Sequence, residues 1–470
     1  MNYLDFDLLI ERAEKKYKAR VLNSPAGQAA VEFSLPFGEA ELENFILKIA
    51  APRAGRINSP ELEAAAKVFG SSLFEAVFND ELLACFRSSL DEAARQGVGL
   101  RLRLRLADVP ELADMPWEYL HYPKLNRFLS LSVETPIVRY LDMPERIRCL
   151  AIDTSLRILV MISNPADYPQ LNVEQEWAKL NNAFSSLKRR RIVELDRLDR
   201  ATWLNLQTKL REREYHIFHF IGHGGFDRQA NDGMLIFEDE NNRSRPVSGQ
   251  KLGMLLRDER MLRLALLNVC EGGRSGRCDP FAGAAQSLVQ QGIPAVIAMQ
   301  FAVTDETAIA LVHQFYDALA DGYAVDSALA EARRAIFGQQ NNIEWGTPVL
   351  YMRSPDGHIF DLVKTRPNIT PPPAGLIVRQ GANHGQAISL GAESKIIGRE
   401  AGQSVVLPDP DISRRHARIG WQGSRYILED LGSTNGTFCN DVQIIGSQPL
   451  CNGDVIRLGR TVLVFQLESE

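Results

Sequence analysis

Two reactive side chains each follow an apolar run and precede a pair of glycines. His223 stands in Gly-His-Gly-Gly at 222–225, and Cys270 stands in Cys-Glu-Gly-Gly at 270–273. A thiol is a strong nucleophile only as a thiolate, and a neighbouring imidazole can supply both the base and a counter-charge. The backbone N–H groups of Gly224 and Cys270 can bind an oxygen that develops negative charge, which contributes about 3 to 4 kcal/mol per donor. These residues predict acyl transfer by a His/Cys dyad.

Either residue alone has a simpler explanation. A lone cysteine at the end of a strand is usually a small buried apolar residue, and a lone histidine is usually a polar residue with satisfied hydrogen bonds. The pairing of the two motifs, with about 45 residues between them, favours chemistry. His219 is a competing base, but it lies within an expected strand, where the two-residue alternation directs it into a sheet face. His223 is therefore the predicted base.

Apolar runs alternate with amphipathic helical runs through the middle of the chain. The apolar runs lie at 156–163, 192–195, 216–221, 234–238, 262–269 and 293–299. Continuous apolar strands between helices are typical of an α/β domain with a mostly parallel sheet covered on both faces. Chemistry in such a sheet lies outside the carboxyl ends of the strands. The runs 216–221 and 262–269 lead directly to His223 and Cys270, which places both at that edge.

The chain of 470 residues divides into four segments. Residues 1–150 are less regular and are expected to form an accessory lobe; within them the alternating Leu-Arg run at 100–106 is typical of a half-buried strand. Residues 151–363 are expected to form the α/β domain. Residues 364–375 contain four prolines in twelve positions and predict a semi-rigid linker. Residues 376–470 have a different character.

Short apolar runs recur through 376–470, separated every eight to twelve residues by Gly, Asn, Asp or Ser. This pattern predicts an all-β antiparallel sandwich. Its loops contain three polar clusters, at 398–399, 413–416 and 433–437. Loops at one end of a sandwich converge on a single site. We therefore expect the three clusters to lie together.

A phosphate dianion suits these clusters. Arg399 offers a guanidinium fork and Ser413 a hydroxyl donor, and Arg414 or Arg415 offers a further cation. The amide of Asn435 can pair with the extended backbone of a peptide. Taken singly, these residues indicate only a turn and a solvated charge. Taken together, they predict a phosphopeptide site.

The two dyad motifs, 219–225 and 267–273, resemble the histidine and cysteine motifs of the CHAT peptidases, relatives of caspases, metacaspases and separase. The resemblance extends from near the amino terminus to about Leu362 and includes the segments 116–118, 292–300 and 345–349. It implies that His223 is the general base and that Cys270 is the nucleophile, which forms an acyl-enzyme with a protein substrate. The implied activity is that of a cysteine endopeptidase.

The resemblance also bears on specificity. The segment 301–306 is similar to the separase segment whose aspartate holds a basic residue before the scissile bond, which makes Asp305 the candidate for a basic-residue pocket. Thr304 or Asp305 also suits the N-cap of the following helix, and the two roles are compatible. Asn268 stands where metacaspases have an acidic residue, and no segment matches the arginines with which caspases hold aspartate. Aspartate specificity is not expected.

The carboxy-terminal clusters resemble, in order and spacing, those of the forkhead-associated (FHA) domain. The resemblance implies that Arg399 and Ser413 bind the phosphate. It further implies that Arg414 and Thr434 contribute nearby and that Asn435 holds the peptide backbone. The implied partner is a phosphothreonine-containing protein, where the phosphothreonine belongs to the substrate, an adaptor or the same chain. The alternative function is a non-catalytic signalling scaffold or phosphopeptide adaptor with a latent or inactive caspase-like domain.

Composition argues against several other classes. A net charge of −6 gives no field that attracts nucleic acid or an anionic membrane, and no long uncharged apolar stretch or leader-like start occurs. Six scattered cysteines fit a reducing cytoplasm. Cys270 and Cys278 lack the spacing of zinc ligands, and no phosphate-binding loop of a nucleotide site is present. We expect no metal and no cofactor.

Overall fold

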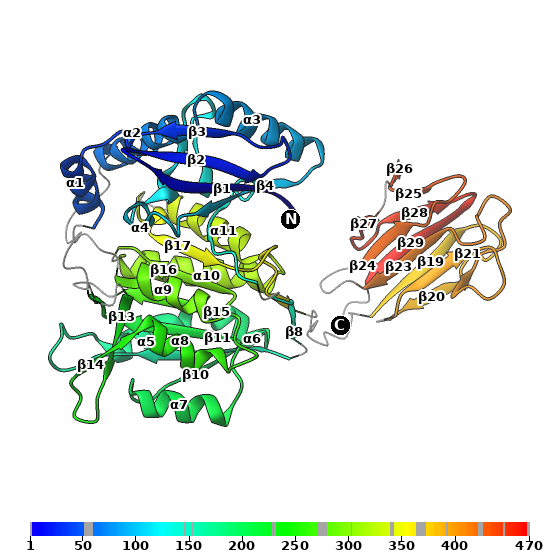
Figure 1. Cartoon of the computed structure of the whole chain (residues 1–470). Coiled ribbons are helices and arrows are strands. Elements are labelled where there is room, and N and C mark those ends of the chain that lie inside the picture. The colour runs from blue at the N-terminus through cyan, green and yellow to red at the C-terminus, as the bar shows by residue number, and fades with distance from the viewer. Residues whose placement is uncertain are drawn as a thin grey trace. The chain divides into compact units, whose positions relative to one another are not determined.

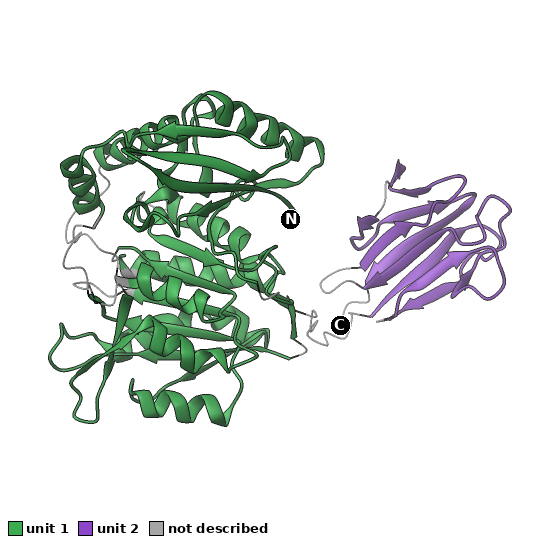
Figure 2. Ribbon diagram, viewed as in Figure 1, with its two compact units in different colours: residues 1–363 green, residues 364–470 purple. Residues whose placement is uncertain are grey.

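The computed structural model describes residues 2–50, 60–144, 147–152, 154–227, 229, 232–269, 280–301, 303–338, 343–362, 373–391, 393–421, 426–444 and 447–467. The chain divides into two compact units, residues 1–363 and 364–470 (Figure 2). Each unit has its own core of buried apolar side chains. No helix in these ranges combines the length and hydropathy that are needed to cross a bilayer.

An eleven-stranded sheet runs through the larger unit (Figure 1). Its strand order is β10 (Val193–Arg197), β9 (Leu156–Ile162), β11 (Ile217–Gly222), β15 (Leu264–Val269), β16 (Ala295–Met299), β17 (Pro348–Met352), β7 (Ile137–Tyr140), β4 (Gly99–Arg105), β1 (Tyr3–Ala13), β2 (Lys16–Asn23) and β3 (Ala30–Phe33). The first five strands of this order, β10, β9, β11, β15 and β16, are mutually parallel. Strand β17 is antiparallel to β16 and begins a second parallel group with β7, β4 and β1. The predicted mostly parallel sheet is confirmed.

Helices cover both faces of the sheet (Figure 1). They are α5 (Val173–Ala183), α6 (Ser185–Arg189), α7 (Trp203–Glu212), α8 (Gly249–Arg257), α9 (Pro280–Gln290), α10 (Asp305–Ala320) and α11 (Val325–Phe337). His219 of β11 faces Tyr316 of α10, whereas the next residue, Phe220, faces Phe281 of α9. Helices α10 and α9 therefore lie on opposite faces, and β11 is buried on both.

Residues 1–150 contribute β1 to β4 and β7 to the same sheet, which is therefore continuous across residue 150. The domain limits expected from the sequence stay a prediction. Further elements of this region are α1 (Glu39–Ala50), α2 (Pro60–Val77), α3 (Asp80–Arg95), α4 (Pro110–Ala113), β5 (His121–Tyr122) and β6 (Arg127–Phe128), with 3-10 turns at Trp117–Tyr119, Pro123–Leu125 and Leu129–Leu131.

Strand β4 is buried on both faces, whereas its Leu-Arg alternation predicted a half-buried strand. Its leucines belong to the core, and its arginines meet carboxylates instead of water. Arg101 Nε lies 2.6 Å from Asp326 Oδ2, and Arg103 pairs with Asp5 at 2.7 Å. Buried cations require such partners. The expectation that one face of β4 meets solvent was wrong. The carboxylates that pair with its arginines are distant in the sequence, so the local pattern does not reveal them.

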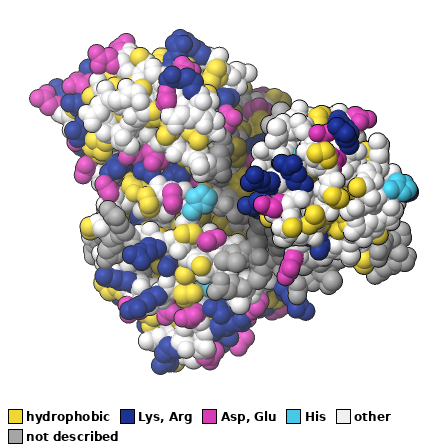
Figure 3. Space-filling view, turned by 90° about the vertical axis from the view of Figure 1, so that its right-hand side faces the viewer, with side chains coloured by type: hydrophobic (Ala, Val, Ile, Leu, Met, Phe, Trp, Pro, Cys, Tyr) yellow, Lys and Arg dark blue, Asp and Glu magenta, His cyan; other side chains and the backbone are white. Residues whose placement is uncertain are grey.

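Smaller sheets complete the larger unit. They are a three-stranded sheet of β12 (Gly224–Asp227), β13 (Asp232–Glu238) and β14 (Ser244–Ser248), and a pair of β18 (Phe360–Leu362) with β8 (Leu150–Ile152). A 3-10 turn covers Glu344–Gly346. In Figure 3, Lys and Arg side chains are interspersed with Asp and Glu side chains.

The smaller unit is built from two sheets. One has the order β20 (Ala387–Leu390), β19 (Ala374–Gln380), β29 (Thr461–Leu467), β28 (Val455–Leu458), β25 (Thr437–Cys439) and β26 (Val442–Gln443). The other has the order β22 (Val405–Val406), β21 (Lys395–Gly398), β23 (Ala417–Trp421), β24 (Tyr426–Asp430) and β27 (Ser447–Pro449). All pairings are antiparallel except that of β21 with β22. The predicted all-β antiparallel fold is confirmed.

Candidate functional site

His223 lies at the carboxyl end of β11 and is almost fully buried, with 1% of its surface exposed. Strand β11 ends at Gly222, which pairs with Val269 at the end of β15. Cys270 lies outside the described residues. The structure therefore places one member of the predicted dyad and the strand that leads to the other.

The hydrogen bond of the His223 ring indicates its tautomer. Its Nε2 is 2.8 Å from the carbonyl oxygen of Pro169, which can only accept, so Nε2 carries the proton. Its Nδ1 is buried and has no hydrogen-bond partner among the described residues. Burial lowers the pKa of His223, against a smaller raising effect of the bond to Pro169. The ring is therefore neutral near pH 7, with Nδ1 as its basic nitrogen.

The loop that contains Pro169 is tied to the turn between β13 and β14. Asp167 Oδ1 accepts from the backbone N–H of Ser244 and Asp167 Oδ2 from its hydroxyl, both at 2.7 Å. The N–H of Ala166 donates to the carbonyl of Asn242 at 2.8 Å. These bonds fix the loop and, through Pro169, the orientation of the His223 ring.

Gly224, the predicted oxyanion donor, begins β12. The N–H of Ile236 donates to the carbonyl of His223, so Gly224 and Leu235 form a pair without mutual hydrogen bonds. The N–H of Gly224 consequently points away from β13. A Cβ at this position would lie 2.3 Å from the Phe281 ring, which explains why glycine is required.

His219 lies in the face of the sheet under α5 and α10. It is fully buried, and neither ring nitrogen has a hydrogen-bond partner among the described residues. Burial lowers its pKa to about 3, so the ring is neutral at physiological pH. The alternation argument from the sequence expected this side chain in a sheet face, and the structure places it there.

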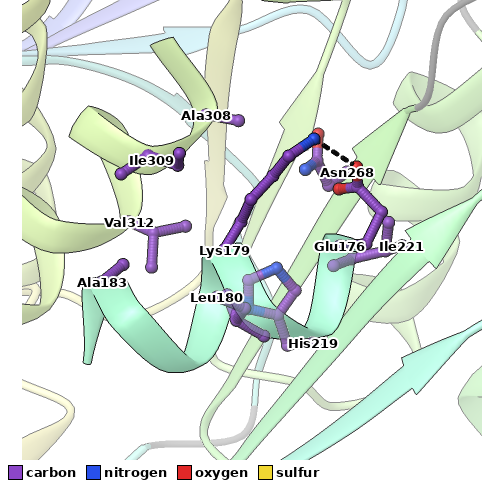
Figure 4. Close-up of a pocket in the computed structure, with 10 residues that line it drawn as sticks. All are labelled: Glu176, Lys179, Leu180, Ala183, His219, Ile221, Asn268, Ala308, Ile309 and Val312. Carbon is purple, nitrogen blue, oxygen red and sulfur yellow. Dashed lines mark hydrogen bonds and ion pairs between the residues drawn. The ribbon is translucent and has the colours of Figure 1, made fainter. Parts of the chain in front are cut away.

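A small pocket, with a cavity volume of about 20 Å³, lies between α5 and α10 (Figure 4). Four polar residues line it: Glu176 and Lys179 of α5, His219 of β11 and Asn268 of β15. The other lining residues are apolar, namely Leu180, Ala183, Ile221, Ala308, Ile309 and Val312. Lys179 Nζ and Glu176 Oε1 form an ion pair at 2.8 Å, drawn as the dashed line in Figure 4.

Helix α10 begins beside this pocket. Its N-cap is Thr304, whose hydroxyl accepts from the N–H of Thr307 and donates to Glu344 at 2.8 Å. Of the two residues that suited the cap, Thr304 fills it. The side chain of Asp305 lies outside the described part of the structure. The assignment of Asp305 to a basic-residue pocket stays a prediction.

The three polar clusters of the smaller unit lie together. The N–H of Thr434 donates to Ser413 Oγ at 3.0 Å, and the N–H of Arg399 donates to the carbonyl of Ser413 at 3.2 Å. Asn435 Nδ2 donates to the carbonyl of Asp411 at 2.8 Å. The neighbouring Arg414 is exposed. The expected convergence of the loops is present, while the ligand roles of these residues stay predictions.

Two supports hold this loop cluster. His416 is buried; its Nδ1 accepts from the N–H of Ser413 at 3.0 Å, and its Nε2 lies 3.2 Å from the carbonyl of Gly436. Gly398 allows the chain of Arg414 to pass closely, because a Cβ on Gly398 would lie 2.0 Å from the carbonyl oxygen of Arg414.

We expect Gly398→Ala to loosen β21 and β23, because such overpacking costs about 1 to 3 kcal/mol. Hydrogen exchange of the full chain, followed by mass spectrometry, should show faster exchange in both strands. Gly391→Ala is the matched control, since a Cβ there meets no atom within 4 Å. Unchanged exchange in Gly398→Ala would show that the two loops adjust without cost.

The CHAT domain model matches residues 67–361, more than half of the chain. The chain belongs to the CHAT family. CHAT is a family of caspase-like peptidases. The CHAT match includes β11, β15 and the pocket between α5 and α10. The FHA domain model matches residues 395–459, which include all three polar clusters. The protein is thus a CHAT domain joined to an FHA domain.

Two curated proteins are similar to about a fifth of this CHAT protein. FhaB of Mycolicibacterium smegmatis, an FHA domain-containing protein, is 40% identical over 88 residues, which are 19% of this chain and 57% of the relative. The oxoglutarate dehydrogenase inhibitor of Corynebacterium jeikeium is 39% identical over 90 residues, 19% of this chain and 62% of the relative. The chain thus spans less than two thirds of these relatives.

Among solved structures, one from an analysis of phosphothreonine-dependent FHA domain interactions is 37% identical, with a TM-score of 0.20. The match covers 21% of this CHAT protein and 99% of that chain.

Sequence reasoning missed three residues of the candidate site. Pro169 contacts His223 through its backbone carbonyl, a group that every residue has and that residue type therefore cannot predict. Glu176 and Lys179 have the spacing of an ordinary solvated helical pair. A usable signal existed for the first, because residues 163–172 follow the carboxyl end of a buried strand, the edge where sites of α/β sheets lie.

Proposed function

We propose that this CHAT protein is a cysteine endopeptidase whose FHA domain directs it to phosphothreonine-bearing proteins. The observation that supports the peptidase is the register of β11 and β15. Gly222 pairs with Val269, and His223 and Cys270 directly follow these two residues. The buried Nδ1 of His223, which has no hydrogen-bond partner in the part of the chain that the structure describes, is the base that a thiol in that position needs.

The proposed reaction uses groups of this chain alone. Nδ1 of His223 takes the thiol proton of Cys270, and the thiolate attacks the carbonyl carbon of the scissile bond. The N–H groups of Gly224 and Cys270 stabilise the oxyanion. The imidazolium then returns the proton to the departing amine. Water, deprotonated by Nδ1, cleaves the thioester and releases the acid, which restores the thiol.

The proposed phosphothreonine site belongs to the FHA domain. Arg399 and Ser413 bind the phosphate, and Arg414 and Thr434 contribute nearby. Asn435 holds the peptide backbone. The convergence of these loops in one place supports the assignment. Tethering raises the local concentration of a bound protein at the peptidase, to about millimolar for a short linker. The phosphothreonine belongs to the substrate, an adaptor or the same chain.

An electrophilic peptide probe tests the peptidase. The purified full chain should react at neutral pH, and Cys270→Ala should abolish this labelling. Cys149 and Cys451 are exposed, so Cys451→Ala is the matched control and should leave the labelling unchanged. Proteomics of labelled protein termini in lysate should yield new termini only with the wild type. Equal labelling of Cys270→Ala, together with no new termini, would favour the scaffold function.

A further inference from the structure

The loop at 163–172, which connects β9 to α5, contacts the ring of His223 in two ways. The carbonyl oxygen of Pro169 accepts from Nε2 of His223 at 2.8 Å. The ring of Tyr168 packs beside the imidazole, with 5.2 Å between the ring centroids. Surface loops are in general more mobile than the strands and helices that they connect. The bond between Pro169 and His223 therefore depends on what holds the backbone of this loop.

Two amide side chains of the same loop hold the backbone on both sides of the Pro169 carbonyl. Nε2 of Gln170 donates to the carbonyl of Tyr168 at 2.9 Å, which fixes the peptide unit before Pro169. Oδ1 of Asn164 accepts from the N–H of Leu171 at 2.8 Å, which fixes the peptide unit after Gln170. The peptide unit that carries the Pro169 carbonyl lies between these two units, so its rotation would break both bonds.

The two amides also support each other. Nδ2 of Asn164 donates to Oε1 of Gln170 at 3.3 Å, and Nε2 of Gln170 donates a second bond, to the carbonyl of Pro165, at 2.9 Å. Because carbonyl oxygens only accept, these partners fix which end of the Gln170 amide is the nitrogen. The backbone N–H of Asn164 donates at 2.8 Å to Glu238, a buried carboxylate at the end of β13. The pair of amides is thereby anchored to the core of the domain.

The bond to Pro169 determines which nitrogen of His223 is basic. An imidazole that donates from Nε2 leaves Nδ1 without a proton. In the proposed reaction Nδ1 takes the thiol proton, and the resulting imidazolium still donates from Nε2. A carbonyl in a fixed position therefore holds the ring in the competent tautomer and stabilises its cation. A carbonyl that turns away would let the ring exchange between two tautomers, of which only one accepts a proton at Nδ1.

We propose that Asn164 and Gln170 form a clamp that holds the Pro169 carbonyl against His223, which makes both of them positioning residues for proton transfer at Nδ1. The inference rests on the proposed peptidase function. Neither side chain touches the reacting atoms, so each acts through the backbone of Pro169. The clamp lies within the loop and is distinct from the bonds that tie Asp167 to the turn between β13 and β14.

Nitrogen NMR of the full chain, labelled at its histidine rings, tests the clamp without turnover. Near neutral pH the two ring nitrogens of wild-type His223 should have widely separated shifts, as in a single tautomer, and His223→Ala identifies these signals. Gln170→Ala and Asn164→Ala should move the two shifts toward each other, because the tautomers then exchange. Gln170→Glu should do the same, since it keeps the size of glutamine and lacks the amide donor. Gln207→Ala, a change of an exposed glutamine on α7, is the matched control and should keep the wild-type shifts.

Peptide hydrolysis provides the second measurement. Gln170→Ala should lower kcat about 10- to 100-fold and leave KM within about twofold, because a displaced catalytic group can cost about 10²-fold in rate. Merged shifts in Gln170→Ala, with no peptide cleaved by the wild type, would overturn the peptidase and leave the clamp on His223. Unchanged shifts in both Gln170→Ala and Asn164→Ala would overturn the clamp, whether or not the wild type cleaves peptides. Merged shifts with a wild-type kcat would also overturn the positioning role.

Discussion

His223→Ala should lower kcat/KM for peptide hydrolysis about 10²- to 10⁴-fold, the usual contribution of a general acid–base. Nδ1 of His223 has no hydrogen-bond partner among the described residues, and in the proposed reaction this nitrogen takes the thiol proton of Cys270. Fluorogenic peptides with arginine before the reporter group provide the measurement. His313→Ala, a change of a half-exposed histidine on α10, is the control and should retain the wild-type rate.

The pH dependence of Cys270 alkylation by iodoacetamide provides a second, independent test of the His223→Ala variant. An imidazolium next to the thiolate lowers the pKa of the thiol, so wild-type alkylation should persist at lower pH than alkylation of His223→Ala. Only the protonated form of His223 provides this charge, and burial lowers its pKa. The imidazolium of His223 therefore persists near neutral pH only where the negative charge of the Cys270 thiolate stabilises it. Superimposable alkylation profiles together with a retained rate would exclude the dyad.

The mostly parallel sheet and the position of His223 at its edge follow from local signals. Continuous apolar runs such as 216–221 have no polar face, so they require burial on both sides and helices between them. The glycines after His223 identify the end of its strand. The loops of the FHA domain are predictable for a similar reason, because polar clusters in a sandwich can only stand at strand ends.

What the sequence left out depends on partners that are distant in the chain. Strand β4 has the alternation of a half-exposed strand, yet Arg101 is buried against Asp326, more than two hundred residues away. Likewise, the pair of Glu176 and Lys179 has the pattern of a solvated helical pair. It becomes part of a pocket only because α10 packs beside α5 and Asn268 lies beneath. No local pattern contains that information.

Arg399→Ala should weaken binding of a phosphothreonine peptide about 10- to 100-fold. A guanidinium forms charge-assisted hydrogen bonds with a phosphate, and each bond to a charged group contributes about 1.5 to 3 kcal/mol. Arg399 is exposed, so its removal leaves no unpaired buried group and the change reports on ligand contact. Calorimetry with phosphorylated and unphosphorylated versions of one peptide provides the measurement.

The matched control for Arg399 is Arg418, which is also exposed but is paired with Glu429 on the neighbouring strand. Arg418→Ala should leave the affinity for the phosphopeptide within about twofold of the wild-type value.

The salt dependence of binding gives a further measurement. Because salt screens contacts with phosphate, the affinity of the wild type should fall from low to physiological ionic strength, and that of Arg399→Ala should fall less. An Arg399→Ala protein that still prefers the phosphorylated peptide as strongly as the wild type would place the phosphate elsewhere. Among the described residues, Arg414 would then be the cation to replace next, since it directly follows Ser413 in the sequence and is exposed.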